Sequence, residues 1–352
     1  MSEQDASARI PFDPDRNLAL ELVRAAEAAA ISSARYVGRG DKIQVDQAAV
    51  DAMRPVLGSV GMRGVVVIGE GEKDEAPIMF NGEEVGSGSD PDVDIAVDPV
   101  DGTTAAAKGL PDAIAVVGLS ERGTMFDRGP CVYMDKLVVP DIAGDDVDPT
   151  APTAEILASV SRTLDKTTQE LTVAVLDRPR HDDIVAEIRE AGAAVTSLLD
   201  GDGDVAGSIA VGQSGSGVDV LIGVGGTPEG VIAACALRCN GAVMCGRLHP
   251  RDADERSAAL DVGHDLDKVL TTRDLVWGDD VFFAATGVTD GSLLRGVRFD
   301  SPWVTTQSLS MRSRSGAVRI IETRHHRTRS NLIRSARHAE PDRRSTANRT
   351  DG

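Results

Sequence analysis

The sequence predicts an α/β fold in which helices pack on sheets. Short apolar runs rich in β-branched residues recur along the chain and end at glycine, proline or aspartate, as buried strands do. Between several of these runs, apolar residues recur at helical spacing. Beyond residue 152 the two patterns alternate, which favours layers of helix on sheet. The length of 352 residues leaves room for two fused halves and a large core.

The N-terminal elements begin with helices. Residues 17–37 carry an alanine-rich apolar pattern at helical spacing, with Asp13 or Asp15 as the expected N-cap and a Gly-Arg-Gly stop after it. A second helix is expected over about 45–57. We expect strands after these helices, and their ranges are 65–68, 93–97, 114–119 and 131–139.

The later elements alternate. The acidic, proline-bearing stretch 140–152 indicates a loop and a boundary. We then expect strands over 171–176, 193–199 and 218–224, and helices over 181–191 and 228–238. The predicted organisation is a flexible N-terminus (1–15), a metal-binding half (16–150), a substrate-binding half (151–326) and a disordered arginine-rich tail (327–352).

Composition and charge limit the classes of function. The net charge is −19, but from Arg312 onward eleven arginines face four acids, so the rest of the chain carries −26. Such an acidic body disfavours nucleic acid as a partner. No run of eighteen apolar residues and no secretory leader is present, so we expect no membrane contact and a cytoplasmic protein. The four cysteines are expected to be buried, reduced thiols.

The most informative segment reads DIAVDPVDGTT, residues 94–104. An apolar strand delivers Asp98, while Pro99 and Gly102 shape a turn on which Asp98 and Asp101 can converge. Paired carboxylates of this kind suit divalent cations, and Thr103 at a helix start suits a phosphate. The alternative is a surface turn in which Thr103 only caps a helix.

A second acidic segment follows another expected strand. Residues 69–75 read GEGEKDE, in which Glu70 lies between two glycines that let the backbone approach a metal closely. Alone, the segment is more typical of a solvated acidic loop. Two apolar strands that each end in an acidic turn nevertheless point to carboxylates around Mg²⁺ or Mn²⁺ and to phosphoryl transfer to water.

These segments resemble the lithium-sensitive phosphatase superfamily and, more narrowly, the class II, GlpX-type fructose-1,6-bisphosphatases. Seven motifs carry the resemblance in matching order, from about residue 16 to residue 326. They are GRGDK (38–42), VIGEGEKDEAP (67–77), VDIAVDPVDGTT (93–104), VYMDKL (132–137), RPRHDD (178–183), DGDVAGSI (202–209) and GVGGTPEGV (223–231). The resemblance implies a layered αβαβα sandwich of the fructose-1,6-bisphosphatase and inositol monophosphatase type.

The resemblance also implies roles for individual residues. Asp46 and Glu70 would bind one Mn²⁺ or Mg²⁺, and Asp98, Asp101 and Glu229 a second; the family often has Glu at the position of Asp101. Thr103 would orient the attacking water or contact the scissile phosphate, and Asp74 would help to activate that water. The implied substrate-binding residues are Asp101, Gly102, Thr103, Tyr133, Arg178, Pro179, Arg180, Asp202, Gly203, Asp204 and Gly226.

Physical chemistry supports several of these assignments independently. Arg178 and Arg180 follow a strand directly, and a guanidinium group can hold the non-reacting phosphate with two hydrogen bonds. Asp202 and Asp204 can accept hydrogen bonds from sugar hydroxyls. Alone, the arginines would be taken for a charged loop at the start of a helix. An extra Asp-Gly before residue 202 leaves the alignment of the DGDVAGSI motif with the family ambiguous by two residues. Lys42 is either a phosphate-binding cation or a solvated lysine.

The expected function is therefore direct, metal-dependent hydrolysis of fructose 1,6-bisphosphate to fructose 6-phosphate, in gluconeogenesis, by a homo-oligomer (dimer or tetramer). Other readings stay open at this point. They are a sedoheptulose-1,7-bisphosphatase, an inositol monophosphatase-like enzyme or nucleotide 3′-phosphatase, and a non-catalytic sugar-phosphate-binding regulator. The arginine pair favours a sugar with a second phosphate. The intact set of carboxylates and Thr103 disfavours a regulator.

Overall fold

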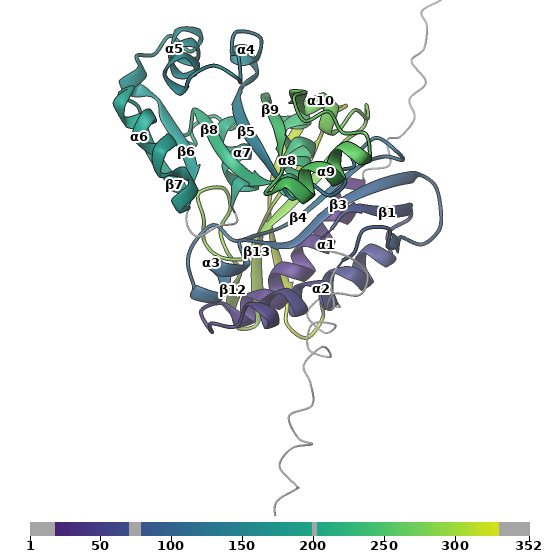
Figure 1. Cartoon of the computed structure of the whole chain (residues 1–352). Helices are drawn as coiled ribbons and strands as arrows, with labels where there is room; N and C mark the ends of the chain where they lie inside the picture. Colours follow the sequence, from purple (N-terminus) through teal and green to yellow (C-terminus); the bar gives the residue numbers. More distant parts are fainter. Residues whose placement is uncertain (1–17, 70–78, 199–202, 331–352) are drawn as a thin grey trace, which may run out of the picture.

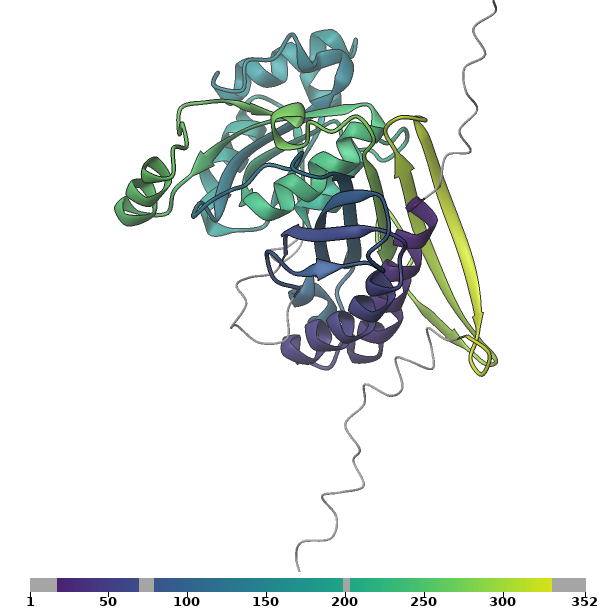
Figure 2. The ribbon, with the colours of Figure 1, turned by 90° about the vertical axis from the view of Figure 1, so that its right-hand side faces the viewer.

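The computed structural model describes residues 18–69, 79–198 and 203–330. Two mixed sheets separate three layers of helices, as Figure 1 and, from the side, Figure 2 show. This arrangement confirms the predicted αβαβα sandwich. The predicted caps Asp13 and Asp15, the N-terminal segment 1–15 and the tail beyond residue 330 lie outside the described residues.

The first sheet has the strand order β12-β13-β11-β4-β3-β1-β2, and β14 pairs with β13. Only β1 and β3 are parallel; the other neighbours in this described sheet are antiparallel. The strand bounds are β1 Arg63–Ile68, β2 Glu84–Val85, β3 Asp92–Asp101, β4 Ile114–Glu121, β11 Phe282–Gly287, β12 Arg298–Asp300, β13 Trp303–Arg312 and β14 Ala317–His326.

The second sheet has the order β10-β9-β5-β8-β6-β7. Its strands are β5 Tyr133–Pro140, β6 Thr172–Leu176, β7 Ala194–Leu198, β8 Val220–Gly226, β9 Ala242–His249 and β10 Leu270–Thr271. The chain thus leaves the first sheet after β4, builds the second, and returns to the first at β11. The C-terminal strands β11 to β14 were not predicted. Strands β12 to β14 are rich in polar residues, whereas β11 reads Phe-Phe-Ala-Ala-Thr-Gly and was passed over despite its apolar run.

Helices α1 (Leu18–Ser33) and α2 (Lys42–Gly58) cover the outer face of the first sheet, and the 3₁₀ turn η1 (Ala34–Tyr36) extends α1. Helices α7 (Asp204–Val211) and α8 (Thr227–Asn240) fill the layer between the sheets. Helices α5 (Thr153–Thr163) and α6 (Asp182–Glu190) cover the outer face of the second sheet. The remaining helices are α3 Thr103–Lys108, α4 Asp141–Gly144, α9 Ala253–Asp261, α10 Thr272–Leu275, η2 Thr168–Glu170 and η3 Pro179–His181.

Several boundaries differ from the predictions. The loop expected over 140–152 contains the short helix α4, and α5 begins directly after it. Strand β3 continues through Pro99 to Asp101 instead of ending before Asp98. Proline lacks only its own backbone N–H donor, so a strand can continue past a proline where its hydrogen-bonded pairing is already irregular. All four cysteines are free thiols, as expected, but Cys239 and Cys245 are half-buried.

The close packing of α8 against the first sheet depends on a glycine. A Cβ atom on Gly118 of β4 would lie 2.7 Å from the Sγ atom of Cys235, which is in the middle of α8. Because Gly118 has no side chain, α8 lies directly on β4 and on its neighbour β3. This close approach sets where the N-terminus of α8 lies relative to the ends of those strands.

Candidate active site

The first part of the site is a β-bulge in β3. Asp98 lies opposite Val116 of β4, and Asp101 lies opposite Ile114, so three residues of β3 span two of β4. In a regular strand, residues three apart point to opposite faces; the extra residue brings Asp98 and Asp101 to the same face. That face carries Ile114 and Val116, which pack in the core layer of α8. The sequence predicted this convergence, although it attributed it to a turn.

Thr103 is held beside Asp46. Gly102 has a φ of 91°, in the left-handed region, and it turns the chain from β3 into α3. Thr103 is the first residue of α3, and its hydroxyl donates to Asp46 Oδ1 of α2 at 2.7 Å. The same hydroxyl lies 2.9 Å from the carbonyl oxygen of Val100. The structure therefore brings together Asp46, to which the family resemblance gives a role in metal binding, and Thr103, to which it gives a catalytic role. The two residues are 57 positions apart in the chain.

Asp101 is fully buried, and Asp98 is half-buried with one oxygen accepting the N–H of Val100 at 2.9 Å. A buried carboxylate stays ionised only where cations or hydrogen bonds compensate its charge. Glu70 and Asp74 lie outside the described residues, which resume at Met79. Within the described residues, no three His, Cys, Asp or Glu side chains converge closely enough to hold a metal ion.

Helix α8 brings Glu229 to the same end of the first sheet. Cys235 contacts Gly118, which pairs with Ala96 of β3. Three residues later in α8, Arg238 donates at 2.8 Å to the carbonyl oxygen of Gly278. Gly278 packs against Ser120 of β4, and Ser120 pairs with Asp94 near the start of β3. The C-terminus of α8 thus points toward the start of β3. Its N-terminus, with Glu229 in the first turn, points toward Asp98 and Asp101.

A cavity of about 380 Å³ lies at the N-terminus of α8. Its lining includes six residues implied in substrate or metal binding, namely Tyr133, Arg178, Arg180, Asp204, Gly226 and Glu229. These residues come from β5, η3, α7, β8 and α8. Pro179 and Gly203 adjoin lining residues in the chain without lining the cavity, and Asp202 lies outside the described residues.

Gly226 is required by the position of Glu229. A Cβ atom on Gly226 would lie 1.8 Å from Glu229 Oε2, closer than any contact allows. Gly226 also pairs with Tyr133 of β5, so the absence of a side chain lets the Glu229 carboxylate fold back over the end of β8. The presence of glycine at position 226 therefore has a direct steric reason, and its implied role in substrate binding stays a prediction.

The cationic wall of the cavity is fixed by aromatic and backbone contacts. The Arg180 guanidinium stacks on the Tyr133 ring, 5.1 Å from its centroid, and donates to the carbonyl oxygen of Val224 at 2.8 Å. His181, next in the chain, is buried. Its Nδ1 lies 2.8 Å from the Leu176 carbonyl, and its Nε2 accepts the Val224 N–H at 2.9 Å. Burial lowers the pKa of His181 below its ordinary value, so the neutral ring holds the Arg180 loop on β8.

Lys136 is a buried residue next to Gly225 of the cavity wall, and in the sequence it stands out only as part of the VYMDKL motif. It lies on the inner face of β5, is 3% exposed, and forms an ion pair with Asp204 at the start of α7. A Cβ atom on Gly225 would lie 2.2 Å from Asp204 Oδ2, so this carboxylate lies directly behind the cavity wall. The sequence does offer a signal for this ion pair, because Lys136 interrupts the apolar strand Met134–Val139. A lysine is almost never buried unless it is paired, so a buried acidic partner could have been expected.

Lys42 is exposed at the first position of α2, where Asp41 caps the helix by accepting the N–H of Gln44 at 3.0 Å. The preceding loop is tied to α3, because the N–H groups of Gly38 and Gly40 donate to the carbonyls of Ala106 and Ala107. No described contact engages the Lys42 ammonium group, so both earlier readings of this residue stay open.

The chain is similar to known proteins over most of its length. A model of the family described as bacterial fructose-1,6-bisphosphatase, glpX-encoded, matches residues 16–325. This chain belongs to that family. It is 41% identical, over 88% of its length and 96% of the relative's, to the D-fructose 1,6-bisphosphatase class 2/sedoheptulose 1,7-bisphosphatase of Synechococcus sp. strain JA-3-3Ab.

Proteins of the same name from Synechococcus sp. strain JA-2-3B'a(2-13) and Trichodesmium erythraeum strain IMS101 are 42% and 40% identical over the same shares. These findings confirm the resemblance and the enzyme class, a phosphoric monoester hydrolase that depends on divalent metal ions. Among the residues that the structure describes, no helix is long and apolar enough to cross a membrane.

The buried pair Lys136–Asp204 gives a stability prediction. Lys136→Met leaves a buried carboxylate without its cation and should lower the free energy of unfolding by about 3–5 kcal/mol. Adding Asp204→Leu should recover most of that loss, because both charges are then removed. Urea denaturation of the purified variants measures both effects.

The matched control is Lys166→Met, which breaks the half-exposed pair with Asp219 and should cost no more than about 1 kcal/mol. Equal losses for Lys136→Met and Lys166→Met would contradict the structural role assigned to the buried pair.

Proposed function

We propose that this chain hydrolyses fructose 1,6-bisphosphate to fructose 6-phosphate and phosphate, and that it also accepts sedoheptulose 1,7-bisphosphate. One observation carries the proposal: Arg178 and Arg180 line the cavity at the N-terminus of α8 together with Glu229, and the first turn of α8 points toward Asp98 and Asp101. A sugar with a phosphate at each end fits such a site. One phosphate lies where cations are held by carboxylates, and the other lies against guanidinium groups.

The carboxylates at this end of the first sheet are proposed to hold divalent metal ions. As the family resemblance implies, Asp46 and Glu70 would bind one ion, and Asp98, Asp101 and Glu229 a second. Carboxylate oxygens suit hard cations such as Mg²⁺ or Mn²⁺. When bound, the ions neutralise phosphate charge and activate water for attack on phosphorus. The burial of Asp101 and the β-bulge that turns it toward Asp98 support this assignment.

Thr103 is proposed to position the reacting groups. Its hydroxyl is 2.7 Å from an Asp46 oxygen, so this carboxylate fixes the orientation of the O–H group. As the first residue of α3, Thr103 also lies where backbone N–H groups favour a phosphate. In this proposal Thr103 holds the attacking water or the scissile phosphate in line, and Asp74 helps to take up the water's proton.

The cationic wall is proposed to bind the phosphate that is not cleaved. Arg178 and Arg180 line the cavity, and the backbone and Tyr133 contacts of Arg180 hold its guanidinium in place. The paired carboxylate of Asp204, with Asp202 and Gly203, would face the sugar hydroxyls. An inositol monophosphate offers no second phosphate to this wall, so the geometry favours the bisphosphate readings.

Three further proposals follow from the family rather than from the site. They are a role in gluconeogenesis, a cytoplasmic location and a homo-oligomeric state, dimer or tetramer. The acidic body of the chain disfavours nucleic acid as a partner. A non-catalytic regulator is a weaker reading, because the hydrogen-bonded Asp46–Thr103 pair that catalysis would use is intact.

A substrate panel tests the proposed activity. Purified enzyme with Mg²⁺ or Mn²⁺ should release phosphate from fructose 1,6-bisphosphate and sedoheptulose 1,7-bisphosphate, and far more slowly from inositol 1-phosphate and adenosine 3′,5′-bisphosphate. Asp98→Ala is the control for contaminating phosphatase. Activity no higher than that of Asp98→Ala on every substrate would remove the enzyme proposal, and preference for inositol 1-phosphate would remove the substrate assignment.

Arg178→Ala should raise KM for fructose 1,6-bisphosphate about 10- to 100-fold with a smaller change in kcat, since charge-assisted hydrogen bonds contribute about 1.5–3 kcal/mol. Arg189→Ala, an exposed arginine in the last turn of α6, is the matched control and should leave KM unchanged. The assay is steady-state phosphate release. A loss confined to kcat would place Arg178 at the reacting phosphate instead.

Thr103→Val should lower kcat by about a hundredfold or more, because a group that positions a proton-transfer step contributes about 10²–10⁴-fold. Thr103→Ser keeps the hydroxyl and should retain most of the activity. Thr104→Val, the neighbouring position in α3, serves as the control. If Thr103→Val and Thr104→Val were equally active, Thr103 would have no part in the chemistry.

A further inference from the structure

One edge of β8 lacks a partner strand where β8 approaches the cavity at α8. Strand β6 pairs with β8 at Val220 and Leu221 and then ends at Leu176, whereas β8 continues to Gly226. On its other side, β8 stays paired with β5 as far as Gly226. The backbone N–H and C=O groups on such an edge need other partners. Within the residues that the structure describes, side chains supply these partners beyond Leu221.

The backbone groups of Val224, in this unpaired part of β8, are held by two neighbouring side chains. The Val224 N–H donates to Nε2 of His181 at 2.9 Å. The Val224 carbonyl oxygen accepts from Nη2 of Arg180 at 2.8 Å and from Nε of Arg180 at 3.2 Å. His181 and Arg180 therefore continue the hydrogen-bonded ladder that β6 leaves incomplete. We call these three residues the Val224 clamp.

The partners of His181 fix which ring nitrogen carries the proton. Nδ1 lies 2.8 Å from the carbonyl oxygen of Leu176, which can only accept, so the proton is on Nδ1. Nε2 accepts the Val224 N–H and is therefore unprotonated. Burial lowers the pKa of His181, and the positive charges of Arg180 and Arg178 lower it further, which favours this neutral ring. The ring is thus a fixed link between the end of β6 and β8.

A glycine makes room for the His181 ring. Gly223 has a φ of 147°, in the region that favours glycine. A Cβ atom on Gly223 would lie 3.1 Å from Nε2 and 3.3 Å from Cε1 of His181, which is closer than ordinary contact. Because Gly223 has no side chain, the ring lies directly against the backbone of β8. This contact joins the RPRHDD motif to the GVGGTPEGV motif, so the sequence encodes both halves of the clamp.

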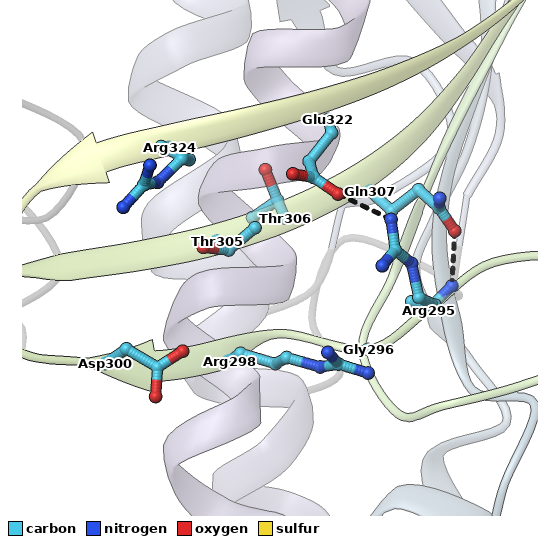
Figure 3. A pocket seen from close by; sticks show the side chains of 9 residues that line it. All are labelled: Arg295, Gly296, Arg298, Asp300, Thr305, Thr306, Gln307, Glu322 and Arg324. Carbon is cyan, nitrogen blue, oxygen red and sulfur yellow. Dashed lines mark hydrogen bonds and ion pairs between the residues drawn. The ribbon is translucent and has the colours of Figure 1, made fainter.

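A second arginine of the molecule shows what the clamp adds. The guanidinium carbon of Arg324 lies 5.1 Å from the centroid of the Trp303 ring, the same distance that separates Arg180 from the Tyr133 ring. Figure 3 shows Arg324 beside a cavity of about 260 Å³, where it forms no hydrogen bond or ion pair within the described part of the chain. Arg180 has the same kind of aromatic contact and, in addition, two hydrogen bonds to Val224. The clamp therefore fixes the Arg180 guanidinium more firmly than stacking alone.

We propose that His181 is a positioning residue for substrate binding, which acts through Val224 to hold Arg180 against the phosphate that is not cleaved. This inference rests on the proposed function, because the ligand assigned to Arg180 is the second phosphate of a sugar bisphosphate. His181 itself does not touch the substrate, since it is 2% exposed and both its ring nitrogens are engaged. Its removal should weaken the binding of the second phosphate and leave the reacting phosphate unaffected.

Two substrates separate this role from a general effect on the fold. His181→Phe keeps an aromatic ring and loses both hydrogen bonds. It should lower kcat/KM for fructose 1,6-bisphosphate about tenfold, mainly through KM, as expected when a charge-assisted hydrogen bond is misplaced. For fructose 1-phosphate, which lacks the second phosphate, kcat/KM should not change. His181→Gln keeps an acceptor for the Val224 N–H and should retain most of the activity. His326→Phe, on β14, is the matched control and should behave like the wild type on both substrates.

A double-mutant cycle tests whether His181 acts through Arg180. Arg180→Ala should raise KM for the bisphosphate, and adding His181→Phe should raise it little further, because the side chain that His181 positions is already gone. Arg324→Ala is the control arginine, and it should leave KM unchanged both alone and with His181→Phe. Equal losses on the two substrates, a His181→Gln variant as defective as His181→Phe, or additive effects of His181→Phe and Arg180→Ala would each overturn the proposal.

A measurement without catalysis separates this inference from the proposed function. In nitrogen-15 NMR of the full chain at neutral pH, the His181 signals, assigned by their loss in His181→Gln, should show a neutral ring with the proton on Nδ1. A charged ring, or a proton on Nε2, would overturn the clamp whatever the activity. A wild-type enzyme that releases no phosphate from either substrate would instead remove the proposed function, and with it the role of His181 in substrate binding, even if the NMR signals agree with the clamp.

Discussion

The extra residue of β3 between Asp98 and Asp101 controls the direction of a carboxylate. Without the bulge, Asp101 would point toward α1 and α2, away from the layer between the sheets. With it, Asp98 and Asp101 share the face that α8 covers. Every other part of the candidate site is arranged around that face. Gly118 lets α8 lie close to the strands, and the helix direction then brings Glu229 toward the two aspartates.

The site separates charges of opposite sign. Asp46, Asp98 and Asp101 belong to α2 and β3 in the layers of the first sheet, whereas Arg178 and Arg180 follow β6 of the second sheet and line the cavity with Glu229. The Lys136–Asp204 pair joins β5 to α7 and is shielded from water by the core. A buried pair contributes little net stability, because desolvation offsets attraction. Its value here is to hold the start of α7 and the cavity wall in one arrangement.

The sequence identified the segments that carry the candidate site more readily than it identified the edges of the fold. The strand-end carboxylates, the arginine pair and the glycine-rich start of α8 were identified because each combines a backbone signal with a chemical one. The bulge at Asp98 was missed, since an extra residue in a ladder depends on the partner strand. Lys136 was passed over because its meaning depends on Asp204, 68 positions away. Strands β12 to β14 carry polar residues along most of their length and are hard to recognise locally, whereas the apolar strand β11 was simply missed.

The identity of the substrate is therefore supported by both the family and the geometry, whereas the metal ligands rest mainly on the family and on the bulge. Crystals of the enzyme grown with Mn²⁺ and fructose 6-phosphate test this most directly. The account predicts anomalous scattering from Mn²⁺ in contact with Asp98 and Asp101, and a sugar phosphate held by Arg178. Manganese bound away from both aspartates, or a sugar phosphate remote from the cavity at α8, would contradict it.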